Sequence, residues 1–464
     1  MTAGAAARTP AAVGADATRD AIEAYHEALT AEVAADSQAM LEAQTQKRDL
    51  FFGDRPLCTV LRPRFMSPGQ YRLLQRRGAA LMAAFRRAHA AAVANASVRA
   101  QFGLTPWEEE LVRTDPGFPW PSPVSRLDAF FAGDEGLRFT EYNAETPAGP
   151  LFNDVLTEIF YALPAMRQFT RGWDVRPLPA RHNVLHALLS AYEAWSGTRA
   201  LPTIAVLDWN DVPTRREFTL FQEYAERQGI RCVVADPRDA ELRGGTLILG
   251  GEPVDLIYKR VLISELIDRC GTDHEVVRAV RDRAVCMVNP FACKILHKKA
   301  SLAVLSDERN ANLYSPQERQ IIAENVPWTR VVEERRTTHD GEPVDLVPFV
   351  AEHKDQFVLK PNDEYGGKGI VLGWEVNDTE WDAALRTALR EPHIVQERVI
   401  LPSEPYPSVV DGRLHIADRM LDTAPFVVYG QYVDGCLTRL STVALLNVTA
   451  GGGSSVPTLL VDRR

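Results

Sequence analysis

The stretch Gln356-Phe-Val-Leu-Lys-Pro-Asn-Asp-Glu-Tyr-Gly-Gly-Lys-Gly-Ile-Val371 decides how the rest of the chain is interpreted. Two short apolar runs flank glycines at positions 366, 367 and 369, which predicts a strand, a glycine loop and a second strand. Because glycine has no Cβ, such a loop can lay backbone N–H groups against phosphate oxygens. Lys360 and Lys368 add two cations suited to phosphate. The alternative interpretation is a hairpin turn on a solvated edge.

This stretch differs from two common phosphate-binding motifs. It contains no Gly-x-x-x-x-Gly-Lys-[Ser/Thr], since position 362 is Asn and Gly369 follows Lys368. It also contains no Gly-x-Gly-x-x-Gly that follows a strand and opens a helix, so the dinucleotide-binding fingerprint is excluded.

A second stretch, residues 125 to 143, predicts a hairpin that carries acidic side chains. Arg126 and Asp128 are two residues apart, as are Glu141 and Asn143, so each pair lies on one face of its strand. Facing strands would bring Asp128, Glu141 and Asn143 together as oxygen ligands of the kind that Mg²⁺ takes. Arg126 on the same face could neutralise a transferring phosphate. The alternative is a solvated hairpin face with an ion pair.

These two stretches together resemble the ATP-grasp enzymes. Arg-x-Asp followed by Glu-x-Asn is similar to the metal site of D-alanine ligases, and Glu141-Tyr-Asn-Ala-Glu-Thr-Pro147 resembles Glu-Tyr-Asn-Ala-Asp-Thr-Pro in the synthetase domain of glutathionylspermidine synthase. In the ordinary ATP-grasp order the metal residues follow the glycine loop, whereas here they precede it. That order resembles the circularly permuted members, over most of residues 120 to 464.

The resemblance implies an α/β (α+β) fold: a circularly permuted ATP-grasp with a small Rossmann-like parallel-sheet sub-domain and an N-terminal helical region. It implies ATP and Mg²⁺ as cofactors and the following roles. For the nucleotide, Lys360 would bind phosphate and the adenine edge, Gly366, Gly367, Lys368 and Gly369 would cover the phosphates, and Lys299, or alternatively Lys298, would be the second lysine, while Gln396 and Glu397 would form the hinge at adenine or ribose. For the metal and the transferring phosphate, Asp128, Glu141 and Asn143 would hold Mg²⁺, and Arg126 would face the γ-phosphate. Arg439, with Asn447 and Gly451 to Gly453, would belong to the closing catalytic segment.

Hydrophobic periodicity divides the chain into four parts. Residues 1–110 are an N-terminal helical region with a disordered lead-in, and residues 111–200 are the metal-binding hairpin plus helices. Residues 201–290 are the Rossmann-like substrate sub-domain, and residues 291–464 hold the lysine and glycine-loop part. We expect helices over 17–48, 67–101, 151–168, 181–195, 213–228, 290–306 and 379–389; strands over 203–207, 231–235, 246–249, 256–258 and 394–400; a strand-like tail over 427–460; and a loop over 105–123.

Composition excludes several classes of protein. The 464 residues carry a net charge of −10, which argues against a general nucleic-acid-binding surface. The six cysteines are scattered and form no Cys-x-x-Cys, so neither a zinc ribbon nor a disulfide framework is indicated. No apolar run is long enough to predict a transmembrane helix, and no signal-peptide core is present near the start. We therefore expect a cytoplasmic protein with no membrane partner.

The expected function is an ATP- and Mg²⁺-dependent ligase that joins a small-molecule or peptide carboxylate to an amine through an acyl phosphate. Such chemistry relies on positioning and charge neutralisation and needs no protein nucleophile. The alternatives are a non-catalytic nucleotide-binding scaffold and a small-molecule kinase on the same fold. An amidase like the one that can accompany glutathionylspermidine synthase is not expected, because no Cys with a paired His stands out. The two substrates and the oligomeric state cannot be predicted from the sequence.

Overall fold

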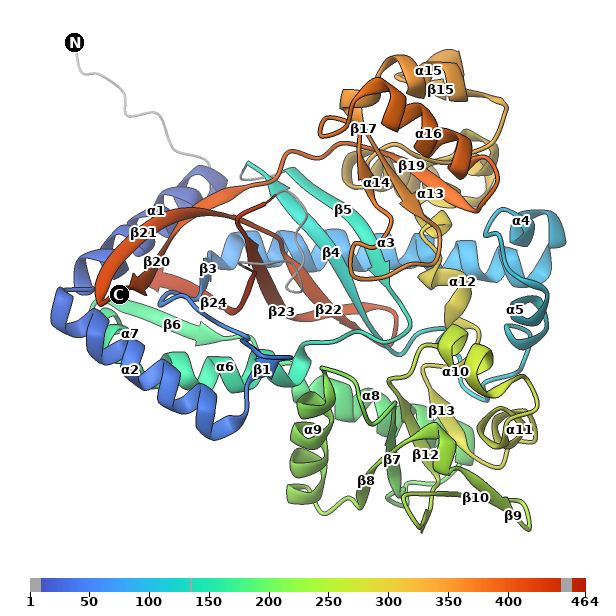
Figure 1. Ribbon diagram of the computed structural model, residues 1–464, viewed down its shortest axis with the longest axis horizontal. Helices are drawn as coiled ribbons and strands as arrows, with labels where there is room; N and C mark the ends of the chain where they lie inside the picture. Colours follow the sequence, from blue (N-terminus) through green and yellow to red (C-terminus); the bar gives the residue numbers. More distant parts are fainter. Residues whose placement is uncertain (1–9, 134–135, 444–452) are drawn as a thin grey trace.

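A nine-stranded sheet forms the largest layer of the protein (Figure 1). In this computed structural model, residues 10–133, 136–443 and 453–464 are described. The main path of the sheet runs β20-β21-β23-β22-β4-β5, and β24 pairs with β23, β3 and β6. Its strands are β3 (Arg64–Met66), β4 (Val124–Ala132), β5 (Gly136–Asn143), β6 (Trp173–Pro177), β20 (Ser403–Val410), β21 (Arg413–Leu421), β22 (Ala424–Val428), β23 (Tyr432–Ser441) and β24 (Ser454–Arg463). The predicted hairpin therefore pairs with strands from the opposite end of the chain.

The helices of the first 200 residues come next, and several of them pack on this large sheet. They are α1 (Pro10–Ala28), α2 (Ala31–Arg48), α3 (Pro68–Ala94), α4 (Ala96–Ala100), α5 (Pro106–Leu111), α6 (Pro150–Ala162), α7 (Pro164–Phe169) and α8 (Arg181–Ser196). Ser67 caps the start of α3, where it forms a capping box with Gln70. This helix lies close to the sheet at Gly78, where a Cβ would come within 2.5 Å of Val433. A short hairpin, β1 (Phe51–Phe52) with β2 (Arg55–Pro56), follows α2.

Several helix and loop predictions differ from the structure. The helices expected over 67–101 and 151–168 are each divided in two, at Asn95 and at Leu163, which have extended backbones. The single helix expected over 17–48 is broken, because Thr30 accepts a hydrogen bond from the backbone N–H of Val33 and caps the start of α2. The loop expected over 105–123 contains α5, which begins with Pro106 after a capping box between Thr105 and Glu108.

The predicted parallel sheet is confirmed and has four strands, in the order β13-β12-β7-β8. They are β7 (Ile204–Leu207), β8 (Cys232–Ala235), β12 (Leu256–Lys259) and β13 (Cys286–Val288), with helices α9 (Arg215–Arg227), α10 (Ile263–Cys270) and α11 (Glu275–Arg281) and the 3₁₀ turn η1 (Pro237–Asp239). The strand expected over 246–249 lies elsewhere. As β10 (Thr246–Leu249) it pairs antiparallel with β9 (Glu241–Arg243) and β11 (Glu252–Pro253), since glycine pairs at 244–245 and 250–251 turn the chain back.

The glycine stretch, residues 356 to 371, folds as the predicted strand, loop and strand. β17 (Phe357–Pro361) and β18 (Val371–Leu372) pair antiparallel, and the glycine loop connects them. They belong to a four-stranded sheet, β14-β19-β17-β18, with β14 (Thr329–Val331) and β19 (His393–Glu397), the latter shorter than the expected 394–400. This small sheet packs on α15 (Leu346–Glu352) and α16 (Asp378–Ala388), around the buried Trp381. The hairpin β15 (Arg336–His339)–β16 (Glu342–Asp345) and the 3₁₀ turn η3 (Lys354–Gln356) complete the lobe at the upper right of Figure 1.

The helix expected over 290–306 is divided in two. α12 (Cys293–His297) ends before Lys298, and α13 (Ala300–Ser306) begins after Lys299. The break is stabilised by Asn362 of the glycine stretch, whose backbone carbonyl accepts the N–H of Lys299 at 2.9 Å and whose side-chain oxygen accepts the N–H of Ala300 at 2.9 Å. Both lysines therefore lie at a corner rather than along a helix face.

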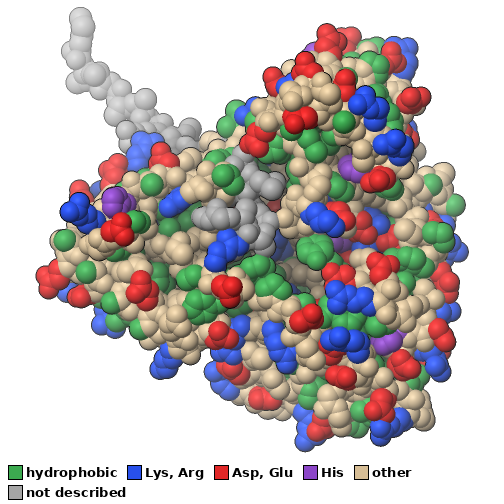
Figure 2. Space-filling view, in the orientation of Figure 1, with side chains coloured by type: hydrophobic (Ala, Val, Ile, Leu, Met, Phe, Trp, Pro, Cys, Tyr) green, Lys and Arg blue, Asp and Glu red, His purple; other side chains and the backbone are tan. Residues whose placement is uncertain are grey.

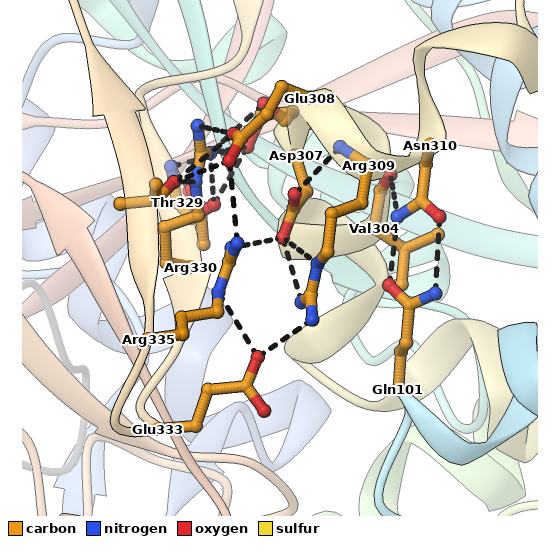
Figure 3. Close-up of polar contacts among 12 residues, drawn as sticks. Gln101, Val304, Asp307, Glu308, Arg309, Asn310, Thr329, Arg330, Glu333 and Arg335 are labelled. Carbon is orange, nitrogen blue, oxygen red and sulfur yellow. Dashed lines mark hydrogen bonds and ion pairs between the residues drawn. The ribbon is translucent and has the colours of Figure 1, made fainter. Parts of the chain in front are cut away.

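Ion pairs join the small sheet to the segment after α13. The 3₁₀ helix η2 (Glu308–Leu313) and α14 (Pro316–Asn325) follow α13. Figure 3 shows Asp307 and Glu333 bridged by Arg309 and Arg335, with N–O distances between 2.5 and 3.1 Å. On the far side of η2, Gln101 and Asn310 exchange two side-chain hydrogen bonds. These contacts fix the lobe that carries the glycine loop against the rest of the molecule.

Two composition-based expectations can be compared with the structure. Each helix in the described ranges is too short or too polar to cross a membrane. The six cysteines are free thiols, as expected from their scattered positions.

Candidate active site

A pocket of about 200 Å³ lies between the large sheet and the small sheet. Its walls include Phe130 and Thr140 from the hairpin and Val358 and Leu372 from the glycine-loop strands. Ten predicted site residues line it: Arg126, Asp128, Glu141, Asn143, Lys360, Gly366, Gly367, Gln396, Glu397 and Arg439. The hairpin and the glycine stretch therefore line one pocket. The visible face of the molecule is hollowed near its centre, with acidic and basic side chains interspersed around the hollow (Figure 2).

The hairpin register brings its polar side chains together. Arg126 pairs with Asn143, and Asp128 pairs with Glu141, in an antiparallel ladder whose register shifts just after Asp128. Nε of Arg126 donates to Asp128 at 2.8 Å, and the amide nitrogen of Asn143 donates to the same carboxylate at 3.1 Å. Period-two alternation and cross-strand pairing are enough to produce this arrangement.

Asp128 lies between two guanidinium groups. Arg439 on β23 donates from Nη2 to Asp128 Oδ2 at 2.7 Å, opposite Arg126. Burial by itself raises the pKa of Asp128, but Arg126 and Arg439 outweigh it and hold the pKa below its ordinary value. The carboxylate is therefore ionised at neutral pH.

Glu141 faces lysines rather than arginines. Lys299 Nζ lies 2.9 Å from Glu141 Oε1 and donates at 2.6 Å to the backbone carbonyl of Glu364 in the glycine stretch. Burial raises the pKa of Glu141, but Lys299 and Lys360 overcome this effect and lower it. Lys298 instead points into a buried ion-pair network with Glu108 and Asp363, at 2.8 Å from each. Of the two candidate lysines, Lys299 is the one that contacts the pocket carboxylates.

Lys360 lines the pocket, and its ammonium group is held by two oxygens. Its Nζ donates to Gln396 Oε1 at 2.7 Å and to the backbone carbonyl of Thr140 at 3.3 Å. Desolvation, opposed by Glu141 and reinforced by Lys299, lowers the pKa of Lys360 to about 8. The amide nitrogen of Gln396 in turn donates to Thr329, so the side chain of Gln396 orients Lys360.

The glycine loop has the backbone freedom that its sequence suggests. Gly366, Gly367 and Gly369 adopt φ values of 64°, 78° and 71°, where a side chain would be strained. Gly366 and Gly367 line the pocket. The side chain of Lys368 is 77% exposed and lies 3.2 Å from Glu364, so in this structure it extends into solvent beside the pocket. Tyr365 donates from its hydroxyl to Glu265 of α10 at 3.1 Å and tethers the base of the loop to the parallel-sheet region.

Sequence reasoning missed several residues that support this site. Asp422 holds Arg439 through bonds of 2.6 Å. Asn289, directly after β13, hydrogen-bonds to the backbone of Val124 and of Ala144 and so holds the two strands together at the open end of the hairpin. Glu145 is fully buried with Lys259 and Lys294, at 3.4 and 3.3 Å. Glu145 could have been found, since it belongs to the quoted Glu-Tyr-Asn-Ala-Glu motif, whereas Asp422 and Asn289 have no local sequence signal.

Part of the expected closing segment lies outside the described residues. Asn447, Gly451 and Gly452 are not described, so their predicted roles stay predictions. Arg439 from the same segment is described and lines the pocket.

The carboxylate and amide oxygens of the hairpin are of the kind that Mg²⁺ takes in proteins. In the described ranges no group of three or more His, Cys, Asp or Glu side chains is placed to hold a metal. Asp128, Glu141 and Asn143 supply two carboxylates and one amide on paired strands, so Mg²⁺ would also need phosphate and water oxygens, as it usually does in nucleotide sites. Asp128 accepts bonds from Arg126 and Arg439, so a metal there would require at least one guanidinium to turn toward phosphate.

Comparison with known proteins supports the fold and gives relatives of uncertain activity. No protein-family model matches the chain. A putative glutamate–cysteine ligase 2-2 from Frankia casuarinae is 25% identical over 356 residues, which cover 71% of this chain and 38% of that protein. An uncharacterised protein of Mycobacterium tuberculosis is 27% identical over 293 residues, which cover 60% of this chain and 50% of that protein. The chain thus spans half or less of the length of these two relatives.

Among solved structures, a glutathione synthetase-like effector from Globodera pallida superposes with a TM-score of 0.59 at 12% identity. The match covers 92% of this chain and 97% of the effector. At this identity the similarity shows only that the chain shares the mixed α/β fold of that effector.

Proposed function

We propose that this chain is an ATP- and Mg²⁺-dependent ligase that joins a carboxylate to an amine on a circularly permuted ATP-grasp fold. The observation that carries the proposal is one pocket in which basic and acidic side chains from two separate sheets converge. Four cations, Arg126, Lys299, Lys360 and Arg439, surround Asp128 and Glu141. Such a cluster is suited to a polyphosphate with a divalent cation, because each component neutralises part of the other.

The permutation is proposed from chain order and position together. The hairpin with the oxygen ligands precedes the glycine loop in sequence, yet both line the same pocket. β4 of the hairpin pairs with β22, and β22 pairs with β23; both β22 and β23 follow the glycine loop in the sequence. The early hairpin therefore lies in one sheet with strands from the C-terminal part of the chain. This connection accounts for how an early hairpin and a late loop can form one site.

In the proposed reaction, the residues of this chain position charge and take no part as nucleophiles. Lys360 and Lys299 would contact phosphate oxygens, and the N–H groups of the glycine loop would cover them. Mg²⁺, held by Asp128, Glu141 and Asn143, would neutralise phosphate charge. A carboxylate oxygen attacks the γ-phosphorus, the bond to ADP breaks, and Arg126 and Arg439 stabilise the transferring group. The amine, after losing a proton, attacks the acyl carbon, and phosphate leaves as the C–N bond forms.

Product analysis with an acyl-phosphate trap tests this proposal. The enzyme is incubated with Mg-ATP and a panel of carboxylates, with hydroxylamine as the amine; a hydroxamate formed together with ADP and phosphate is the expected result. Glutamate with cysteine is the first natural pair to test, since the Frankia relative carries that name. ADP with a stable phosphorylated product would indicate a kinase instead. ATP binding without turnover for any carboxylate would favour the scaffold.

Two variants make this assay specific to the pocket. Glu141→Gln removes one proposed metal oxygen charge and should abolish hydroxamate formation without loss of the fold. Asp154→Asn is the matched control, since Asp154 is a buried carboxylate that bonds the backbone of Ala180 and Arg181 away from the pocket. Equal hydroxamate formation by Glu141→Gln and the unmodified enzyme would contradict the assigned metal site.

A further inference from the structure

Two buried residues between β21 and β22 support strands that line the pocket. Asp422 and Thr423 follow the last residue of β21 and precede the first residue of β22. Asp422 is fully buried and Thr423 is 2% exposed. Neither residue lines the pocket, yet each contacts an element that does.

Asp422 forms hydrogen bonds with both the backbone and the side chain of Arg439. The N–H of Arg439 donates to Asp422 Oδ1 at 2.6 Å, and the N–H of Asp422 donates to the carbonyl of Arg439 at 3.1 Å. Nε of Arg439 donates to Asp422 Oδ2 at 2.6 Å, and Nη2 lies 2.6 Å from the same oxygen. One side of the guanidinium is thereby occupied, and Nη2 also reaches Asp128 at 2.7 Å. A planar, forked guanidinium held this way has few orientations left.

Thr423 contacts the hairpin at the place where its register shifts. Its backbone exchanges two hydrogen bonds with Ala129, at 2.8 and 2.9 Å. The register of β4 and β5 shifts between Asp128 and Ala129, so this bridge supports the strand at the irregularity. The extra residue is Thr140 on β5, because Asp128 pairs with Glu141 and Ala129 pairs with Phe139, so Thr423 holds β4 directly opposite the irregularity and next to Asp128.

We propose that Asp422 is a positioning residue, which acts through Arg439 and sets where its guanidinium meets Asp128 and a bound polyphosphate. Asp422 bonds Arg439, and Thr423 bonds Ala129, the neighbour of Asp128. These two consecutive residues would therefore fix the positions of Arg439 and Asp128 relative to each other. This inference rests on the proposed function in one respect, that the ligand of the pocket is a polyphosphate. The coupling between Asp422 and Arg439 is independent of the ligand.

A double-mutant cycle on stability tests that coupling without any substrate. Asp422→Asn in the otherwise unmodified chain should lower the unfolding temperature, because Arg439 loses a charged partner. In the Arg439→Ala background the same substitution should raise the unfolding temperature, because it removes a buried carboxylate that has lost its cation. The same direction of change in both backgrounds would overturn the inference. If Asp422→Asn alone does not fold, the comparison of Arg439→Ala with the double variant still decides it.

A binding cycle then tests the effect on the pocket, with Mg²⁺ and inorganic tripolyphosphate as the probe. We expect Asp422→Asn to weaken tripolyphosphate binding by about tenfold in the unmodified chain and by less than about twofold in the Arg439→Ala background. The control Asp154→Asn, a buried carboxylate bonded to backbone N–H groups, should leave the affinity within about twofold. Equal weakening by Asp422→Asn in both backgrounds would contradict the positioning role.

The two proposals fail in distinguishable ways. If the unmodified protein does not bind tripolyphosphate, the proposed function is wrong. The coupling between Asp422 and Arg439 is then tested only by the double-mutant cycle on the unfolding temperature. If it binds tripolyphosphate and the cycle is additive, the proposed function survives and the positioning role of Asp422 is wrong. A turnover assay with an identified carboxylate should repeat the pattern, with kcat lowered by about tenfold to a hundredfold in Asp422→Asn.

Discussion

Replacement of Lys360 by alanine is the perturbation whose consequence can be worked out most fully from the structure. Lys360 Nζ is held at 2.7 Å by Gln396 and at 3.3 Å by the carbonyl of Thr140, and it lies in the wall of the pocket. A hydrogen bond to a charged group contributes about 1.5–3 kcal/mol, so the variant should weaken ATP binding by that amount. This range corresponds to roughly 10- to 150-fold in Kd.

The stability of the fold should change less than the affinity. After truncation, Gln396 Oε1 loses its donor, which costs about 1–3 kcal/mol when the acceptor stays unsatisfied. The variant also removes a cation that burial disfavours, which offsets part of this cost. Binding should be weakened rather than abolished, because Lys299 and the two pocket arginines remain.

Isothermal titration calorimetry with ATP and Mg²⁺ measures the effect. The matched control is Lys354→Ala, near the start of the same strand; Lys354 contacts Asp355 and the carbonyls of Gly373 and Val376 and does not line the pocket. The control should bind ATP as the unmodified chain does. Unchanged ATP affinity in Lys360→Ala, or equal losses in both variants, would refute the assignment of Lys360 to a phosphate.

Three further predictions follow from contacts in and behind the pocket. ATP affinity should fall as pH rises through about 8, because Lys360 loses its charge there, and Lys360→Ala should show no such fall. The free energy of unfolding should instead rise between pH 8 and the ordinary lysine pKa. In that range the unfolded chain still binds the proton that the folded chain has lost. Lys299→Ala should weaken ATP binding in calorimetry, whereas Lys298→Ala should mainly lower the unfolding temperature, because it leaves the buried Glu108 without its 2.8 Å partner; the reverse pattern would make Lys298 the nucleotide lysine. Glu145→Gln should destabilise the fold by about 3–5 kcal/mol in denaturant titration, as expected when one member of a buried ion cluster is removed, and a loss under about 1 kcal/mol would contradict the importance of that cluster.

Local patterns were sufficient where strands and caps are decided by neighbouring residues. The period-two spacing of Arg126 with Asp128 and of Glu141 with Asn143 predicted the shared face, and the structure pairs them across the hairpin. The strand, loop and strand around the glycines were likewise predicted from a short segment. α5 had a usable signal that was overlooked, since Thr105, Pro106 and Glu108 form a capping box inside a proline-rich stretch that suggested a loop.

Other features depend on partners that are remote in sequence. The helix break at Lys298 and Lys299 is stabilised by Asn362, so the local helical pattern could not reveal it. β20 contains Pro405 and Pro407, which argue against a strand, and it is accommodated at the edge of the large sheet. Asp422 joins the site through the fold of the C-terminal strands, and no short motif marks it. These features therefore depend on tertiary contacts, which the spacing of residues within a short segment does not reveal.

The most direct test of the central claim is whether Mg²⁺ and ATP bind to this pocket as one unit. Calorimetric Kd values for ATP are measured with and without Mg²⁺, for the unmodified chain and for Glu141→Gln. The account predicts that Mg²⁺ strengthens ATP binding to the unmodified chain by about tenfold or more, in keeping with one well-placed metal contact, and that Glu141→Gln loses most of this gain. ATP binding that is equally dependent on Mg²⁺ in both proteins, or no ATP binding by the unmodified chain, would contradict it.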